Sequence, residues 1–160
     1  MVKYSDVYWQ DVEAVMQQIP NKERMFGKGI FITGATGMIC SSVAEILFYL
    51  NFRYKADIKI MLAGRSKDNM QKRFSCFTEG KDYFFVPFDA MEQSMPDIHA
   101  EYMIHGAGNA SPTVYTQQPI ETMLANIVGL NSVLQAAVQG GSERVLYISS
   151  SEVYGSKEDN

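Results

Sequence analysis

Two glycines, Gly34 and Gly37, lie three residues apart where an apolar run meets an amphipathic stretch. A glycine pair between a strand and a helix can cradle a diphosphate, because the backbone approaches the ligand closely and the helix start offers free N–H groups. Gly34 can adopt the backbone angles of a sharp turn, and Gly37 permits the close approach. We therefore predict a dinucleotide site here. Its contact residues in the turn are Gly34, Thr36, Gly37, Met38 and Ile39.

The next apolar run ends with a cation where dinucleotide-binding folds often carry a carboxylate. That carboxylate accepts hydrogen bonds from the adenosine ribose, whereas Arg65 and Ser66 follow Gly64 here. The Arg65 guanidinium would tolerate a ribose 2′-phosphate, but it could equally stack on adenine beside an unphosphorylated ribose. These residue types leave the choice between NAD and NADP open.

Alternating strand and helix patterns place these residues at strand ends. We predict strands over residues 29–33, 58–63, 83–87, 102–105 and 144–149, and helices over 39–50, 66–74 and 119–140. Apolar strands that alternate with helices indicate a parallel sheet covered on both faces. The expected fold is α/β, a Rossmann-type doubly wound parallel sheet that is incomplete at its C-terminal side, because no helix follows the last strand.

The N-terminal segment has helical periodicity but carries no chemistry. Its apolar residues are Tyr8, Val12, Val15, Met16 and Ile19. Ser5 or Asp6 could cap this helix, and Pro20 would end it. We predict a helical extension over residues 1–27 and a dinucleotide-binding domain over residues 28–160.

Composition excludes several classes of protein. The chain has 160 residues, of which 46 % are hydrophobic and 20 % charged, so a single soluble domain is expected. Its longest near-continuous apolar stretch, residues 44–50, is too short to span a bilayer. A net charge of −4 with scattered basic residues indicates no nucleic-acid partner. Two cysteines, neither at metal-ligand spacing, predict no metal site and a cytoplasmic location.

The glycine turn and two later segments carry a family resemblance. The turn after Thr33 resembles that of extended short-chain dehydrogenases/reductases. Residues 110–115, 119–122 and 126–129 are similar to the NAD-dependent epimerase/dehydratase family, in particular its UDP-glucuronate decarboxylase and dTDP-glucose 4,6-dehydratase group. The resemblance implies a tightly held NAD, a sugar-nucleotide substrate and transient oxidation at the sugar's C4.

The resemblance also implies site residues beyond the turn. Asp89, followed by Ala90, would accept the adenine amino group, and Asn126 would lie in the helix that backs the active site. Small residues after His105 suit a backbone that passes over the nicotinamide-side ribose, and His105 itself is expected to be a buried imidazole with its hydrogen bonds satisfied. The remaining residues are Ala107 and Gly108 beside the cofactor and Ser111 and Tyr115 beside the sugar nucleotide.

The serine-rich segment after the last strand matches the family's catalytic region. Ser150 takes the place of the catalytic Ser or Thr, whose hydroxyl bonds to the sugar oxygen that becomes a ketone. Glu152 matches a carboxylate that acts near the sugar's C5. Dehydratases have Asp between these positions, whereas this chain has Ser151, which favours the decarboxylase pattern over water elimination.

One position departs from the family pattern within the turn. Cys40 stands where the third glycine permits close packing of helix and strand. Its side chain should push the helix outward slightly or require a smaller neighbour. We interpret Cys40 as a small buried filler rather than a catalytic group.

The family's proton-abstracting pair is missing. None of the nine tyrosines is followed four residues later by Lys, the spacing that places a Tyr and its Lys on one helix face. Either the chain is the N-terminal part of a longer enzyme and inactive alone, which we favour, or it is a non-catalytic NAD(P)-binding or interaction module. A homodimer is expected only by analogy with the family.

Overall fold

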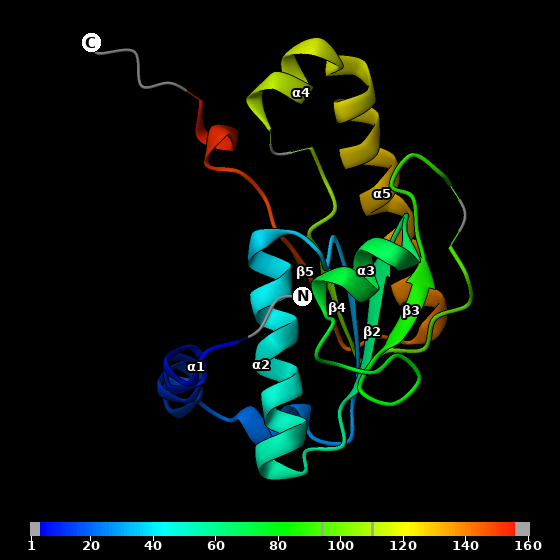
Figure 1. Ribbon diagram of the computed structural model, residues 1–160. Coiled ribbons are helices and arrows are strands. Elements are labelled where there is room, and N and C mark those ends of the chain that lie inside the picture. Colours follow the sequence, from blue (N-terminus) through cyan, green and yellow to red (C-terminus); the bar gives the residue numbers. More distant parts are fainter. Residues whose placement is uncertain (1–3, 94, 110, 156–160) are drawn as a thin grey trace.

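A five-stranded parallel sheet with helices on both faces forms the centre of the protein (Figure 1). A computed structural model describes residues 4–93, 95–109 and 111–155. The strands are β1 (Gly29–Thr33), β2 (Lys59–Gly64), β3 (Phe84–Pro87), β4 (Tyr102–His105) and β5 (Arg144–Tyr147). The helices are α1 (Asp6–Gln18), α2 (Met38–Tyr54), α3 (Lys67–Arg73), α4 (Pro112–Gln117) and α5 (Pro119–Gly140), with 3₁₀ turns at Lys22–Met25 and Ser151–Tyr154. The predicted Rossmann-type fold is confirmed.

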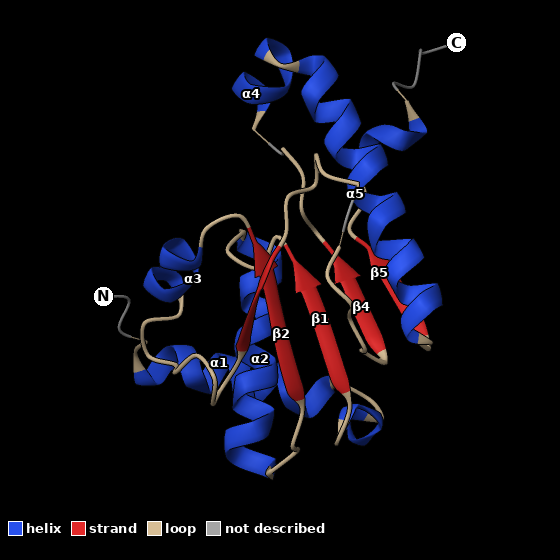
Figure 2. Ribbon diagram, turned by 90° about the vertical axis from the view of Figure 1, so that its right-hand side faces the viewer, coloured by secondary structure: helices blue, strands red, loops and turns tan. Residues whose placement is uncertain are grey.

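The strand order places the predicted site residues on one edge of the sheet. The order is β3-β2-β1-β4-β5, and each neighbouring pair is parallel. All carboxyl ends therefore lie on the same side, as Figure 2 shows for β2, β1, β4 and β5. From β1 the chain adds β2 and β3 on one side of the sheet and then β4 and β5 on the other side. The gap between the carboxyl ends of β1 and β4 is therefore the position where open α/β sheets bind their ligands.

Alternate residues of the strands supply two separate cores. Ile30 and Ile32 pack with α1, α2 and α3 on one face, whereas Phe31 packs with α5 on the other. The period of two is a direct consequence of the pleat. A parallel sheet buried on both faces explains why the whole of β1 is buried and why its residues before Thr33 are apolar or glycine.

The N-terminal helix α1 belongs to the first of these cores. The Ser5 side chain accepts a hydrogen bond from the Tyr8 N–H and so caps the helix. Val12 and Met16 are buried in the same cluster as α2. The helix ends at Gln18, before Pro20, as the sequence predicts.

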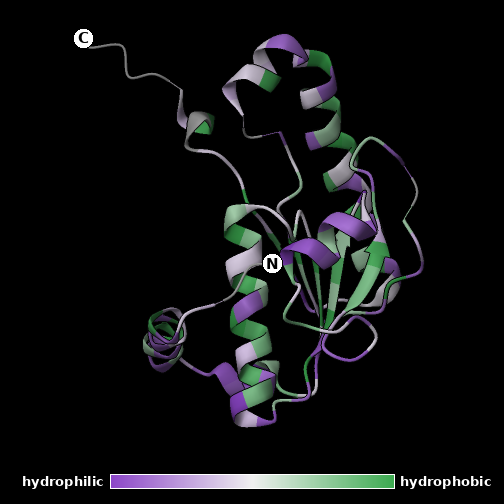
Figure 3. Cartoon of the chain, in the orientation of Figure 1, coloured by the Kyte–Doolittle hydropathy of each residue, from purple (hydrophilic) through white to green (hydrophobic). Residues whose placement is uncertain are grey.

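The polar character of α3 contrasts with the strands beside it. Figure 3 shows a largely hydrophilic α3 next to hydrophobic strands, and Met70 is its buried residue. Ser66 caps α3 by accepting from the Asn69 N–H. The predicted helix therefore begins one residue later than expected and ends at Arg73.

Some boundaries and several short elements differ from the predictions. The helix α2 continues to Tyr54, beyond its predicted end at residue 50. α4 and both 3₁₀ turns were not expected, and β5 ends at Tyr147 rather than at residue 149. α4 starts at Pro112, which suits the first turn of a helix because proline lacks the N–H that would have no partner there. In the part of the chain described by the structure, no helix is both long and apolar enough to cross a membrane.

Candidate functional site

The glycine turn joins β1 to α2 by a close backbone crossing. Gly34 has a φ of +66°, and a Cβ there would lie 2.4 Å from the carbonyl oxygen of Gly106. The Gly37 N–H donates to the Gly34 carbonyl at 2.9 Å, which closes the turn. Only glycine can adopt the left-handed backbone and also leave room for Gly106 in the loop that follows β4, which we call the β4 loop. The predicted sharp turn at Gly34 is thus confirmed.

The start of α2 faces away from the core. Met38 and Ile39 are 86 % and 55 % exposed, and Thr36 and Gly37 are also exposed. The Ser41 N–H donates to the Gly37 carbonyl at 2.9 Å. The N–H groups of the first helical residues before it have no carbonyl within the helix, so they and the helix dipole favour an anion at this edge. The five predicted turn residues are therefore brought together.

Thr33, the last residue of β1, fixes the β4 loop against the turn. Its buried Oγ1 accepts from the N–H groups of Gly106 and Ala107, both at 3.2 Å, and lies 2.8 Å from His105 Nδ1. Because the hydroxyl accepts twice from N–H groups, its proton is available to Nδ1, which assigns the neutral ring the tautomer protonated at Nε2. Our sequence interpretation gave Thr33 no such role. Its polar side chain at the end of an apolar strand was the available signal.

His105 is fully buried, as expected, but its hydrogen bonds are not all satisfied. Nε2 has no hydrogen-bond partner among the described residues. The ring stacks on Tyr147 with centroids 5.6 Å apart and meets the edge of Phe88 at 6.2 Å. The expectation that all hydrogen bonds of the imidazole are satisfied is therefore wrong for Nε2. The imidazole packs against the aromatic side chains of Tyr147 and Phe88, where polar partners were expected. Burial lowers the pKa of His105 below its usual value.

This environment predicts a pH dependence of stability. The unfolded chain binds a proton on His105 below about pH 6.5, whereas the folded chain resists it. The free energy of unfolding should therefore fall as pH drops from about 6.5, by up to about 1.4 kcal/mol per pH unit. Urea unfolding measured from pH 7.5 to 5.5 tests this, with His105→Gln expected to remove the slope and His99→Gln, at an exposed site, to retain it. An unchanged slope in His105→Gln would contradict it.

Cys40 fits beside the β4 loop because the residue opposite its sulfur, Gly106, has no side chain. The residue is 3 % exposed, and a Cβ on Gly106 would lie 2.3 Å from Cys40 Sγ. The sulfur therefore occupies the space that a larger residue at position 106 would need. The expected smaller neighbour is Gly106, and Cys40 is the predicted buried filler. Burial raises the pKa of the Cys40 thiol, which opposes a nucleophilic role.

Asp89 and Ala90 lie in the loop after β3, and this loop packs against α5. One oxygen of the Asp89 carboxylate, Oδ1, accepts from the Met91 N–H at 3.0 Å, forming a local turn. Ala90 packs against α5, because a Cβ on Gly129 would lie 2.8 Å from the Ala90 Cβ. The close approach to Gly129 fixes this loop at the same edge of the sheet as the glycine turn.

A second loop contact links two other predicted cofactor residues. A Cβ on Gly108 would lie 2.9 Å from Asn126 Oδ1, so the loop after β4 runs directly against α5. Asn109 Nδ2 donates to Thr122 Oγ1 at 3.3 Å in the same region. Ser111 is the exposed residue that precedes α4, and Tyr115 lies half-buried within that helix.

The remaining predicted residues follow β2 and β5. Arg65 is exposed directly after β2, and Ser150 is exposed after β5. The side chain of Glu152 lies outside the described part of the structure. The geometry thus connects the glycine turn to the β4 loop, and α5 to the loops after β3 and β4.

Comparison with known families agrees with this arrangement. A sequence model described as the NAD dependent epimerase/dehydratase family matches residues 30–160. The chain belongs to this family. The match includes β2 to β5, all of β1 but its first residue, and all the candidate site residues.

Individual family members are more distant. The chain is similar to UDP-glucuronic acid decarboxylase 2 of Arabidopsis thaliana, with 28 % identity over 152 residues that cover 92 % of this chain and 31 % of the relative. UDP-glucuronic acid decarboxylase 6 of the same plant is 29 % identical over 126 residues, covering 79 % and 34 %. The chain therefore spans about a third of the length of these curated relatives.

Solved structures share the fold. A UDP-galactose 4-epimerase superposes with a TM-score of 0.65 and 23 % identity over 82 % of this chain and 41 % of that one. UDP-glucose 4-epimerase from Bifidobacterium longum, solved with NAD⁺ and UDP, gives a TM-score of 0.61 at 17 % identity, covering 82 % and 39 %. At these identities the likeness concerns the fold alone.

Proposed function

We propose that this chain forms the NAD-binding part of a sugar-nucleotide epimerase or decarboxylase that works through a transient 4-keto sugar. The observation that carries the proposal is the turn at Gly34 and Gly37, which meets the loop after β4 at the point between β1 and β4 where the strand order changes direction. The family match and the decarboxylase relatives support it.

The residues present fit a dinucleotide. Gly37, Met38 and Ile39 are exposed at the start of α2, where the first N–H groups have no carbonyl partner within the helix and can receive a diphosphate. We assign the N–H groups of Met38 and Ile39 to that diphosphate. Asp89 Oδ1 holds the loop, and we assign Oδ2 of the same carboxylate to the adenine amino group. When bound, NAD would accept a hydride from the sugar and return it.

The sugar side of the site is assigned to residues that follow β4 and β5. In the proposal, Ser150 donates a hydrogen bond to the C4 oxygen and Glu152 acts near C5 or the carboxyl group. Ser111 and Tyr115 border the sugar nucleotide. Ser151, in place of a dehydratase Asp, and the similarity to UDP-glucuronic acid decarboxylases favour a UDP-sugar carboxylate as substrate.

Proton abstraction from the sugar hydroxyl is the step these 160 residues do not provide in the family's usual form, because no tyrosine precedes a lysine by four positions. The chain's own contribution is to bind and orient cofactor and sugar.

The lack of a Tyr followed four residues later by Lys favours the second candidate function, a non-catalytic NAD(P)-binding module. A sugar-nucleotide-dependent rise in NADH absorbance, once the chain is combined with a family C-terminal half, would favour the enzyme.

Calorimetric titration with NAD and NADP tests the binding proposal. We expect a saturable heat with NAD, and no heat with either dinucleotide at millimolar concentration would refute it.

The choice between the two dinucleotides should depend on Arg65. If its guanidinium stands beside the ribose 2′ position, Arg65→Ser should weaken NADP binding by at least about tenfold, because charge-assisted hydrogen bonds contribute about 1.5–3 kcal/mol. NAD binding should change less than about twofold. Lys81→Ser, at an exposed site on the β3 side of the chain, serves as the control. Equal losses for NAD and NADP would contradict the 2′-phosphate contact and indicate stacking on adenine.

A further inference from the structure

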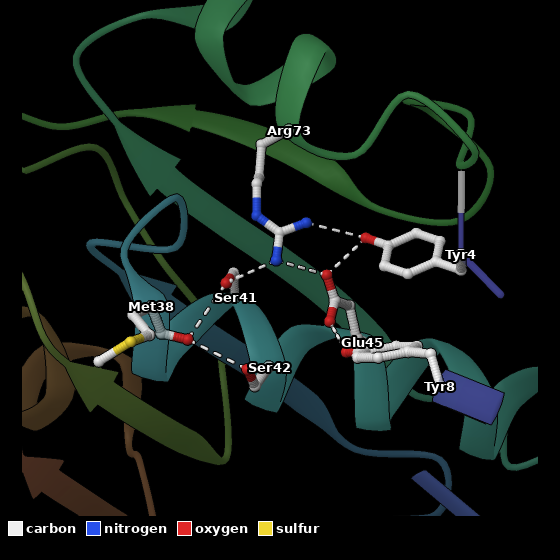
Figure 4. A network of polar contacts seen from close by, with 7 residues as sticks. All are labelled: Tyr4, Tyr8, Met38, Ser41, Ser42, Glu45 and Arg73. Atoms are coloured by element: carbon white, nitrogen blue, oxygen red, sulfur yellow. Dashed lines mark hydrogen bonds and ion pairs between the residues drawn. The ribbon is translucent and has the colours of Figure 1, made fainter. Parts of the chain in front are cut away.

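A buried carboxylate lies on α2, outside the candidate site. Glu45 is 1 % exposed and pairs with Arg73 of α3, with Nη2 and Oε1 2.6 Å apart. The Tyr4 hydroxyl donates to the same oxygen at 2.5 Å, and the Tyr8 hydroxyl donates to Oε2. Figure 4 shows these four side chains converging between α1, α2 and α3.

Arg73 extends this network to the start of α2. Its Nη1 donates to the Tyr4 hydroxyl at 2.9 Å, and its Nη2 donates to Ser41 Oγ at 2.8 Å. Ser41 Oγ in turn donates to the Met38 carbonyl at 3.2 Å (Figure 4). Met38 is the first residue of α2 and the last but one of the predicted turn contacts. A continuous chain of contacts therefore leads from α1 to the glycine turn.

The N-terminal segment supplies two of the hydrogen-bond donors to the buried Glu45 carboxylate. A buried carboxylate is costly unless it is paired and hydrogen-bonded on both oxygens. Arg73 serves Oε1, whereas Oε2 is served by Tyr8. Burial, aided by Glu45, raises the pKa of Tyr4 to about 12, so its hydroxyl remains a donor at ordinary pH. Without the two tyrosines, Glu45 would keep only part of its partners, and Arg73 would be less firmly placed against Ser41.

We propose that Glu45 and Arg73 are positioning residues for the dinucleotide turn, and that α1, through Tyr4 and Tyr8, sets the affinity of that turn for its ligand. Arg73 holds the first turn of α2, whose N–H groups are assigned to the diphosphate. It also ends α3, the helix that begins just after Arg65. Arg73 therefore joins the first turn of α2 to α3, the helix that follows Arg65. This inference rests on the proposed NAD binding and adds a dependence on a segment that contains no predicted cofactor contact.

The test compares NAD affinity in hydroxyl-deletion variants. The double variant Tyr4→Phe/Tyr8→Phe keeps both rings and should bind NAD at least about fivefold more weakly, the lower end of typical coupling between sites. Tyr83→Phe is the matched control, because the Tyr83 hydroxyl is buried in the same cluster without a hydrogen-bond partner among the described residues. It should bind NAD like the wild type.

A second control separates positioning from loss of stability. Val133→Ala removes buried volume on the opposite face of the sheet, away from α1. It should lower stability while leaving the NAD dissociation constant within about twofold. A Val133→Ala effect on affinity as large as that of the tyrosine double variant would overturn the inference.

The wild-type chain offers a reciprocal measurement that needs no variant. Coupling between two sites acts in both directions, so bound NAD should slow hydrogen exchange of the α1 amides and protect Trp9, the only tryptophan of the chain, from quenching by acrylamide. Wild type that binds NAD without either change, or a double variant that binds NAD equally well, overturns this inference alone. A wild type that binds no NAD overturns the proposed function together with it.

Discussion

Gly34→Ala is expected to destabilise the chain by about 3 kcal/mol and to abolish dinucleotide binding. Two effects add. A left-handed backbone costs a residue with a Cβ about 1–2 kcal/mol. The new Cβ would also lie 2.4 Å from the Gly106 carbonyl oxygen, a backbone atom that cannot move by a side-chain rotation. Relief requires the β4 loop to move away from the turn. Urea unfolding followed by Trp9 fluorescence, with NAD calorimetry, measures both consequences.

Gly27 provides the matched control for this variant. Its φ is +70°, close to that of Gly34, but a Cβ there would meet nothing within 4 Å. Gly27→Ala should therefore cost only the backbone strain, about 1 kcal/mol, and leave NAD binding intact. Similar losses for the two variants would show that the contact with Gly106 is not what makes Gly34 necessary.

Gly106→Ala should cost about 2 kcal/mol in the natural chain but less than about 0.5 kcal/mol once Cys40 is replaced by alanine. The new Cβ would overlap Cys40 Sγ, at 2.3 Å, whereas its next contacts, with Ile148 and the Thr33 carbonyl, are at 3.5 Å and unstrained. Cys40→Ala alone should cost about 1 kcal/mol for the buried sulfur.

The double-mutant cycle built from these variants measures the pairing directly. A coupling free energy near 1.5 kcal/mol, with the double variant more stable than the sum of the single losses predicts, would confirm that positions 40 and 106 share one space. Additive losses would mean that the loop, and not the sulfur, limits residue size at position 106.

Periodicity alone predicted most of the fold. β4 and α5 have the predicted boundaries, because an apolar run bounded by polar residues and a helix bounded by Pro119 and Gly141 are both marked locally. The positions of the site residues followed from the same pattern, since parallel strands bring their carboxyl ends to one edge.

Contacts between distant residues were beyond the reach of local patterns. Thr33 and His105 are separated by 72 positions, so nothing near either residue in the sequence indicates their hydrogen bond. Glu45 stands in the apolar stretch of residues 44–50, but burial of its carboxylate depends on Tyr4 and Tyr8 of the N-terminal segment and on Arg73 of α3. α4 is too short for its periodicity to be distinguished from a loop.

Amide chemical shifts recorded during a titration with NAD test the central claim most directly. If the diphosphate lies against the start of α2, the largest changes will fall on the amides of Met38 and Ile39, with smaller ones at Ala107 and Gly108. Saturation with NAD that leaves those four amides unmoved, or that shifts mainly residues of the opposite edge of the sheet, would contradict the account.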